Sequence, residues 1–149
     1  MSVAADQGGA MGLAGTWYNE LNSTMILEDD GSGNLRGTYE SAVGLQLGQC
    51  SLTGRYDTGS NAPGTALGFM VVWQTANVNA NAVTTWSGQF QVVDGKEQIF
   101  TMWLLSIVND KDSDWNSIEV GQDLFTRNRR SDMQVAAPSS KRGASPRKR

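Results

Sequence analysis

The sequence contains no histidine and only one cysteine, Cys50, among its 149 residues. The absence of histidine removes the commonest general base, the commonest metal ligand and any Ser-His-Asp triad. A single cysteine can form neither an intrachain disulfide nor a cysteine-based metal cluster. We therefore expect no metal site and no cofactor, and we interpret Cys50 as a small filler at the end of a strand.

The sequence also lacks any stretch long and apolar enough to predict a membrane-spanning helix. Its first ten residues, MSVAADQGGA, show neither the basic nor the apolar region of a signal peptide. Two expectations stay open: the protein remains in the cell, or this is a mature secreted form that carries an added methionine.

Charge is unevenly divided along the chain, although the formal net charge is only −3. Residues 1–126 hold four basic and 14 acidic side chains, whereas residues 127–149 hold eight basic and one acidic. The basic stretch has no hydrophobic period and is rich in serine, proline, arginine and lysine. We expect a folded domain over residues 12–126, flanked by disordered segments at 1–11 and 127–149.

The basic tail could attract nucleic acid, but only non-specifically, because no aromatic residue is interleaved to stack on bases. We favour a solvated tail that folds back on the acidic body.

Period-two alternation dominates the remaining sequence, and turn-forming residues separate the alternating runs. The linkers include DDGSGN, TGSNAPG, VDG and NDKDSD. Strands are predicted at about 13–19, 23–28, 35–42, 50–57, 66–75, 83–93, 96–107 and 118–125. This spacing predicts an all-β antiparallel meander that forms a sandwich or a closed barrel.

A weak repeat favours the barrel. Glycine precedes an aromatic residue by two positions at Gly15–Trp17, Gly37–Tyr39, Gly54–Tyr56 and Gly88–Phe90. Small and large side chains that alternate on an inward face suit the taper of a small barrel. We therefore predict an eight-stranded antiparallel up-and-down β-barrel.

Several predicted strands carry polar residues on the same face as large aromatics. In GTYESAVG, for example, Tyr39, Ser41 and Val43 share one face, and in AVTTWSGQF Thr84 shares a face with Trp86. Each buried polar group without a partner costs ~1–3 kcal/mol, so an interior built only for packing would avoid them. The pattern predicts a pocket for a small, largely apolar ligand with a compact polar head.

The sequence resembles the avidin and streptavidin family of biotin-binding proteins over about residues 12–126. The resemblance rests on seven motifs in the family's order: GTWYN, GTYESAVG, LTGRYD, GTALGF, TTWSGQF, WLL and VGQDLF. It implies high-affinity, non-covalent binding of biotin as a ligand, sequestration of free biotin, and secretion.

The resemblance also implies a role for each site residue. Asn19, Ser23 and Tyr39 would donate hydrogen bonds to the ureido oxygen of biotin, while Ser41 and Asp123 would accept from its two N–H groups. The Thr84 hydroxyl would lie near the thioether sulfur. The apolar walls would be Trp73, Trp86, Trp103, Leu105 and Val43.

The rim of the site is the part that depends most on the resemblance. The segment LQLGQCS, which begins at Leu45, would form a mobile loop whose backbone N–H groups reach the carboxylate of biotin. Trp115 would close the site of a neighbouring subunit in a homotetramer, although a dimer stays open. The basic tail could instead occupy a neighbouring mouth. Ala82 stands where the streptavidin pattern has a serine, so we expect weaker recognition of the ligand carboxylate.

Two other functions compete with biotin binding. An enzyme using Asp123 as acid or base is disfavoured, because the sequence offers no matching second inward carboxylate, no histidine and no metal set. A lipocalin-like carrier of another small ligand, or a barrel-type protease inhibitor, would share the architecture but would not need the polar set described above.

Overall fold

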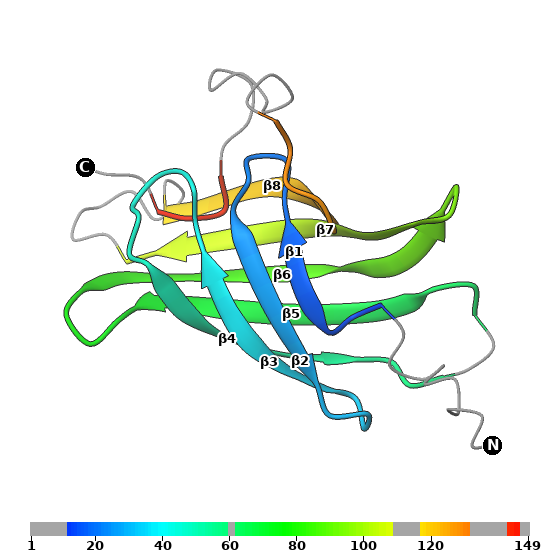
Figure 1. Ribbon diagram of the computed structural model, residues 1–149. Helices are drawn as coiled ribbons and strands as arrows, with labels where there is room; N and C mark the ends of the chain where they lie inside the picture. The colour runs from blue at the N-terminus through cyan, green and yellow to red at the C-terminus, as the bar shows by residue number, and fades with distance from the viewer. Residues whose placement is uncertain (1–11, 60–61, 109–116, 132–142, 147–149) are drawn as a thin grey trace.

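The computed structural model describes residues 12–59, 62–108, 117–131 and 143–146. Eight antiparallel strands form a closed barrel in which each strand pairs with the next and β8 returns to β1 (Figure 1). The strands are β1 Gly15–Tyr18, β2 Thr24–Asp29, β3 Asn34–Glu40, β4 Gln49–Tyr56, β5 Thr65–Gln74, β6 Asn79–Val93, β7 Lys96–Ile107 and β8 Ile118–Thr126. The all-β barrel predicted from the sequence is therefore confirmed.

The predicted strands correspond one to one with the observed strands, and two boundaries differ in an informative way. β6 begins at Asn79, several residues earlier than predicted. β3 ends at Glu40, so Ser41 lies in the β3–β4 loop instead of on the strand. The Ser41 hydroxyl oxygen accepts a hydrogen bond from the Val43 N–H over 3.3 Å, and this local bond turns the chain.

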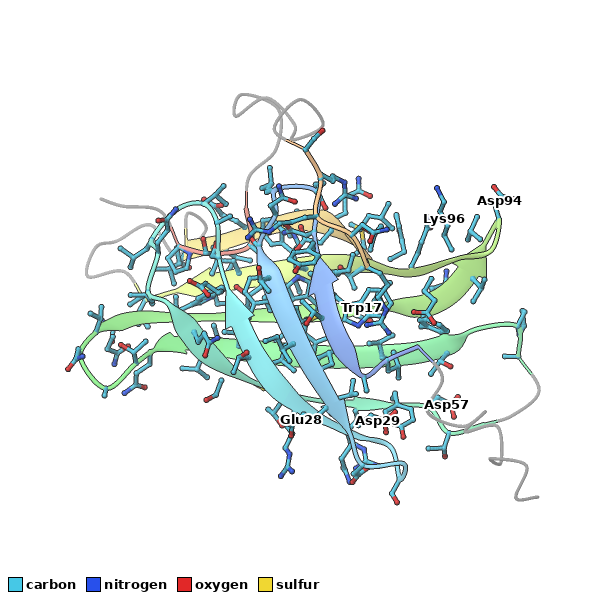
Figure 2. All side chains as sticks on the ribbon, viewed as in Figure 1. Trp17, Glu28, Asp29, Asp57, Asp94 and Lys96 are labelled. Carbon is cyan, nitrogen blue, oxygen red and sulfur yellow. The ribbon has the colours of Figure 1, made fainter. Side chains whose placement is uncertain are left out.

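The barrel core follows from the alternation of side chains along each strand. Along β7, for example, Ile99, Thr101, Trp103 and Leu105 are buried while the residues between them are exposed. One end of the interior is filled by Trp17, which projects inward from β1 (Figure 2) and packs edge-on against Phe90. We call the other end, where β1, β3, β5 and β7 finish, the mouth.

Three of the four glycines of the Gly-x-aromatic repeat, Gly37, Gly54 and Gly88, lie where neighbouring backbones approach closely. A Cβ added to Gly37 would lie 1.8 Å from the Ile26 carbonyl oxygen, and one added to Gly88 would lie 2.0 Å from the Phe100 carbonyl oxygen. Both contacts are with backbone of an adjacent strand, which cannot move aside. These glycines therefore permit the tight coiling of a small closed barrel.

The outer surface of β7 and β8 is unusually apolar. Five large side chains are about half exposed or more there: Phe100, Met102, Leu104, Ile118 and Val120. Leu104 and Val120 are directly paired in the sheet register, so the exposed groups form one continuous patch. In the part of the chain that the structure describes, no helix has the length and hydropathy needed to cross a membrane.

Candidate ligand-binding site

Four polar residues meet inside the barrel below the mouth. Asn19 and Ser23 flank the turn between β1 and β2, Tyr39 comes from β3, and Asp123 comes from β8. Each is only 1% exposed. The structure thus brings together four residues that the sequence predicted as the polar part of a ligand site.

Hydrogen bonds to the backbone fix the orientation of Asn19. Its side-chain oxygen accepts the N–H groups of Leu21 and Ser23, over 3.0 and 2.9 Å. Its Nδ2 is therefore the end that faces the interior, 3.3 Å from both the Tyr39 hydroxyl and Asp123 Oδ1. The turn therefore holds an amide donor toward the polar cluster.

Asp123 is held by one donor on β6 and one in the β1–β2 turn, and it has an unusual protonation equilibrium. Its Oδ2 accepts a hydrogen bond from Trp86 Nε1 over 2.8 Å, and its Oδ1 accepts one from Asn19. Burial, followed by the nearby charge of Glu20, raises the pKa of Asp123 to about 7, while the bonds from Trp86 and Asn19 oppose this shift. The carboxylate and carboxylic acid forms are therefore both accessible near neutral pH.

Glu20 is a residue of this region that the sequence interpretation missed. It is almost fully buried, and its Oε2 accepts a hydrogen bond from the Leu124 N–H over 3.0 Å. The available signal was the acidic residue in WYNEL, beside Asn19. Strict alternation turns that side chain away from the interior, but the β1–β2 turn returns it to β8.

Tyr39 forms the aromatic centre of the site. Burial, and then the charge of Asp123, raise the pKa of the Tyr39 phenol well above its usual value, so the group stays neutral and can donate. Its ring lies 5.0 Å from the Trp86 ring and edge-on to Trp73 at 5.7 Å, measured between centroids. The phenol is thus rigidly placed by its neighbours.

The predicted apolar walls are present in the barrel interior. Trp73, Trp86, Trp103 and Leu105 are each at most 2% exposed. Trp73 Nε1 donates to Thr84 Oγ1 over 2.8 Å, which links β5 to β6 beneath the mouth. Trp103 Nε1 is buried and has no hydrogen-bond partner among the described residues. Such an unpaired donor fits a pocket that binds polar atoms.

The remaining predicted residues that the structure describes lie at the mouth. Ser41, Val43 and Leu45 belong to the β3–β4 loop, and they and Thr84 contact the segment Gly143–Pro146 from the end of the chain. Trp115 lies outside the described residues. Within those residues, no group of three or more histidine, cysteine or acidic side chains is arranged to hold a metal ion.

Comparison with known proteins identifies relatives of this chain. The model of the avidin family matches residues 8–128. Afifavidin from Afifella pfennigii is 30% identical over 124 residues, which are 83% of this chain and 74% of that protein. Avidin-related protein 1 from Gallus gallus is 32% identical over 123 residues, 78% of each chain.

A second kind of relative is much longer. Fibropellin-1 from Strongylocentrotus purpuratus is 31% identical over 119 residues, which are 77% of this chain but 11% of that protein. The match to fibropellin-3 from the same organism covers 20% of its length. A segment similar to this chain therefore also occurs as a small part of larger proteins.

Proposed function

The chain belongs to the avidin family, and from that premise we propose that it binds biotin non-covalently and with high affinity in the mouth of the barrel. The observation that carries the proposal is the buried polar cluster of Asn19, Ser23, Tyr39 and Asp123, enclosed by tryptophan side chains. A core built only for packing gains nothing from four such groups.

The proposed roles at the polar end follow the hydrogen-bonding capacity of each group. Asn19 Nδ2 and the hydroxyls of Ser23 and Tyr39 donate to the ureido oxygen of biotin. Ionised Asp123 accepts one ureido N–H, and Ser41 accepts the other. Donors on the carbonyl and a carboxylate on the N–H side polarise the urea in the same direction, which strengthens both sets of bonds.

The proposed roles at the apolar end follow from shape. Trp73, Trp86 and Trp103 enclose the bicyclic ring, and Leu105 and Val43 contact the hydrocarbon chain. Thr84 faces the thioether, and the Leu45 N–H reaches the carboxylate of the ligand. In a tetramer, Trp115 of one subunit would cover the site of another.

Calorimetric titration with biotin tests the proposal. We expect one site per chain, with Asp123→Ala losing most of the affinity, because removal of the charged acceptor leaves a ureido N–H unpaired in a dry site. Asp94→Asn is the matched control, since Asp94 lies at the tip of the β6–β7 hairpin, far from the mouth (Figure 2). The absence of both binding heat and a change in tryptophan fluorescence on addition of biotin would contradict biotin binding.

The alternative is a lipocalin-like carrier of another small ligand with a polar head. The two functions differ in what they require of the polar cluster. A biotin site needs donors and acceptors that match a urea, whereas a general carrier tolerates changes among them. Retention on a biotin column that is lost on conservative substitution of Tyr39 by phenylalanine would favour the biotin site.

We propose that the biological consequence of binding is sequestration of free biotin, without chemistry on the ligand. Secretion is consistent with that role. Recovery of unmodified biotin after denaturation of the complex tests the absence of chemistry, and growth of a biotin-requiring microorganism in the presence of the protein tests sequestration.

We also propose that the protein forms a homotetramer through the apolar patch on β7 and β8, since contiguous exposed apolar side chains on a protein surface mark interfaces. Leu104→Lys should shift the mass measured by light scattering toward the monomer. Thr53→Lys adds the same charge to the exposed face of β4 and should leave the mass unchanged. If the measured mass of the wild type corresponds to two chains, the protein is a dimer and not a tetramer.

A further inference from the structure

The seam between β1 and β8 is closed by side chains close to the ligand site. Tyr18 and Thr126 pair the two strands in the sheet register. Nearer the mouth, the Leu124 N–H donates to Glu20 Oε2 over 3.0 Å, and Arg130 Nη2 donates to the Leu124 carbonyl oxygen over 3.5 Å. Side chains from the β1–β2 turn and from the chain after β8 therefore bind the backbone groups that a neighbouring strand would otherwise bind.

Asn22 fastens this seam through two hydrogen bonds to the backbone of Arg130. Asn22 Nδ2 donates to the Arg130 carbonyl oxygen over 2.8 Å, and Asn22 Oδ1 accepts the Arg130 N–H over 2.8 Å. The Arg130 guanidinium adds little to this attachment. Its Nη2 makes only the bond of 3.5 Å, and its Nη1 is buried without a hydrogen-bond partner among the described residues. The side-chain amide of Asn22 is therefore the main link between the β1–β2 turn and Arg130.

The backbone conformation of Asn22 suits this contact. Its φ is 62°, a left-handed conformation that asparagine and glycine adopt more readily than other residues. The Asn22 N–H also donates to the Asn19 carbonyl oxygen over 3.0 Å, which closes the turn. Replacement of Asn22 by glycine can therefore keep the backbone of the turn while it removes the side-chain amide.

The β1–β2 turn carries two of the proposed ligand donors, Asn19 and Ser23. Asn19 Oδ1 accepts the N–H groups of Leu21 and Ser23, so the direction of its Nδ2 depends on the shape of the turn. Ser23 Oγ accepts the Ala42 N–H over 3.0 Å, which joins the turn to the β3–β4 loop. A shift of the turn would therefore move both donors together.

We propose that Asn22 is a positioning residue for the polar end of the ligand site, and that it acts by anchoring the β1–β2 turn to Arg130. The inference rests on the proposed function for the identity of the ligand. Donors that are already aimed at a carbonyl oxygen bind it without the cost of being ordered first. Both ends of the Asn22 amide are bonded to Arg130, so its effect on the ligand passes through Asn19 and Ser23.

The first experiment is hydrogen exchange in the ligand-free protein. The backbone amides of Leu21 and Ser23 donate to Asn19 Oδ1 and report whether the turn loosens. In Asn22→Gly we expect both to exchange at least about tenfold faster, since two hydrogen bonds are lost. Asn22→Asp keeps an acceptor for the Arg130 N–H but has no donor for its carbonyl oxygen, so it should restore part of the protection.

Two controls separate this effect from general changes in the barrel. Asp94→Gly also removes a side chain at a positive φ, here 51°, but at the tip of the β6–β7 hairpin (Figure 2). Trp17→Phe weakens packing at the closed end. Neither should change the exchange of the Leu21 and Ser23 amides by more than about twofold, because a turn exchanges through local opening. Equal rates in wild type and Asn22→Gly, or equal acceleration in all of these variants, would overturn the proposal.

The second experiment locates the effect within the site through double-mutant cycles, with biotin affinity measured by calorimetry. Asn22→Gly should weaken biotin binding about tenfold. In an Asn19→Ala background the same change should cost no more than about twofold, because the donor that Asn22 positions is already absent. In a Thr84→Val background it should still cost about tenfold, since Thr84 comes from β6 and belongs to the thioether end of the proposed site. Equal costs in the two backgrounds would overturn the positioning role.

The two experiments distinguish this inference from the proposed function. If wild-type protein does not bind biotin, the proposed function fails, while the exchange of the Leu21 and Ser23 amides still decides whether Asn22 anchors the turn. Faster exchange in Asn22→Gly with unchanged biotin affinity would overturn the positioning role and leave biotin binding supported.

Discussion

Trp86 Nε1 donates a hydrogen bond to Asp123 Oδ2 over 2.8 Å. Trp86 is therefore both an aromatic wall of the site and the residue that holds Asp123, the one acidic side chain in the described polar cluster. The bond joins β6 to β8 across β7, where Trp103 pairs with Trp86 on one side and with Gly121 on the other. Replacement of Trp86 therefore changes both the shape of the pocket and the charge state of Asp123.

Trp86→Phe tests this double role. We expect biotin affinity at pH 7 to fall by roughly 10- to 100-fold, because a hydrogen bond to a charged group contributes about 1.5–3 kcal/mol. Loss of the donor also raises the pKa of Asp123 further, so the deficit should shrink at pH 9. Calorimetric titration at both pH values measures this.

The matched control for that substitution is Trp17→Phe at the closed end of the barrel. It removes an indole bond to the Leu13 carbonyl oxygen and disturbs the core, but not the polar cluster. Stability should fall while biotin affinity changes by no more than about twofold. An equal loss of affinity in the two variants would show that general loosening of the barrel, and not the bond to Asp123, controls binding.

Glu20→Gln should change the pH dependence of biotin binding. Since the pKa of Asp123 is about 7, wild-type affinity should fall about tenfold for each pH unit well below 7, as the acceptor becomes protonated. Glutamine keeps an oxygen for the Leu124 N–H but removes the charge that raises the pKa of Asp123. The midpoint of the affinity curve should therefore move to lower pH.

The measurement is the biotin dissociation constant between pH 5.5 and 8.5. Asp94→Asn again serves as the control, because it removes one carboxylate at the remote hairpin tip and keeps the positive φ of 51° that asparagine tolerates. A flat wild-type curve over this range, or an upward shift of the midpoint in Glu20→Gln, would refute the coupling between the two carboxyl groups.

The raised pKa of Asp123 weakens biotin binding at low pH, but it makes the ligand-free protein more stable there. The folded-state pKa of Asp123, about 7, lies above its ordinary value of 3.8, so the folded protein binds more protons than the unfolded chain between these values. The contribution of Asp123 to the free energy of unfolding is therefore present at low pH and is lost as pH rises toward 7. Asp123→Asn should remove this decline.

Denaturant unfolding of both proteins at pH 5 and pH 8 provides the measurement. The informative quantity is the difference between wild type and Asp123→Asn, because other carboxyl groups also contribute to the pH dependence. Asp30 is one example: bonds from Asn34 and Ser32 lower its pKa, so its contribution has the opposite sign. If wild type gains stability relative to Asp123→Asn as pH rises, Asp123 is ionised in the folded state throughout.

The fold could be predicted from the sequence because barrel strands bury every second residue. That rule correctly placed Tyr39, Thr84, Trp86 and Asp123 inside, since each lies within a regular strand. The rule did not give the end of β3. Ser41 is buried, as alternation predicts, but it lies in a turn that its own hydroxyl helps to form, and alternation contains no information about such bonds.

The burial of Glu20 and of residues 143–146 could not be predicted for a related reason. The bonds from Leu21 and Ser23 to Asn19 Oδ1 set the turn that points Glu20 toward β8, and these appear only in three dimensions. Composition predicts that a basic tail without a hydrophobic period is disordered. The burial of Ala144 depends instead on a short run of small side chains that fits a narrow mouth. The mean composition of the tail does not show such a short run.

Ala82→Ser tests whether the carboxylate end of biotin is weakly recognised. Ala82 lies on β6 two residues before Thr84 and is buried near the mouth. A serine hydroxyl there should donate to the ligand carboxylate and slow biotin dissociation by roughly tenfold, below the full value of a charged hydrogen bond because the mouth is wet. A neutral biotin amide should gain much less. Ala80→Ser, two residues earlier on the same face of β6, is the control. The idea is refuted if wild-type protein already releases biotin much more slowly than the biotin amide and Ala82→Ser changes neither rate.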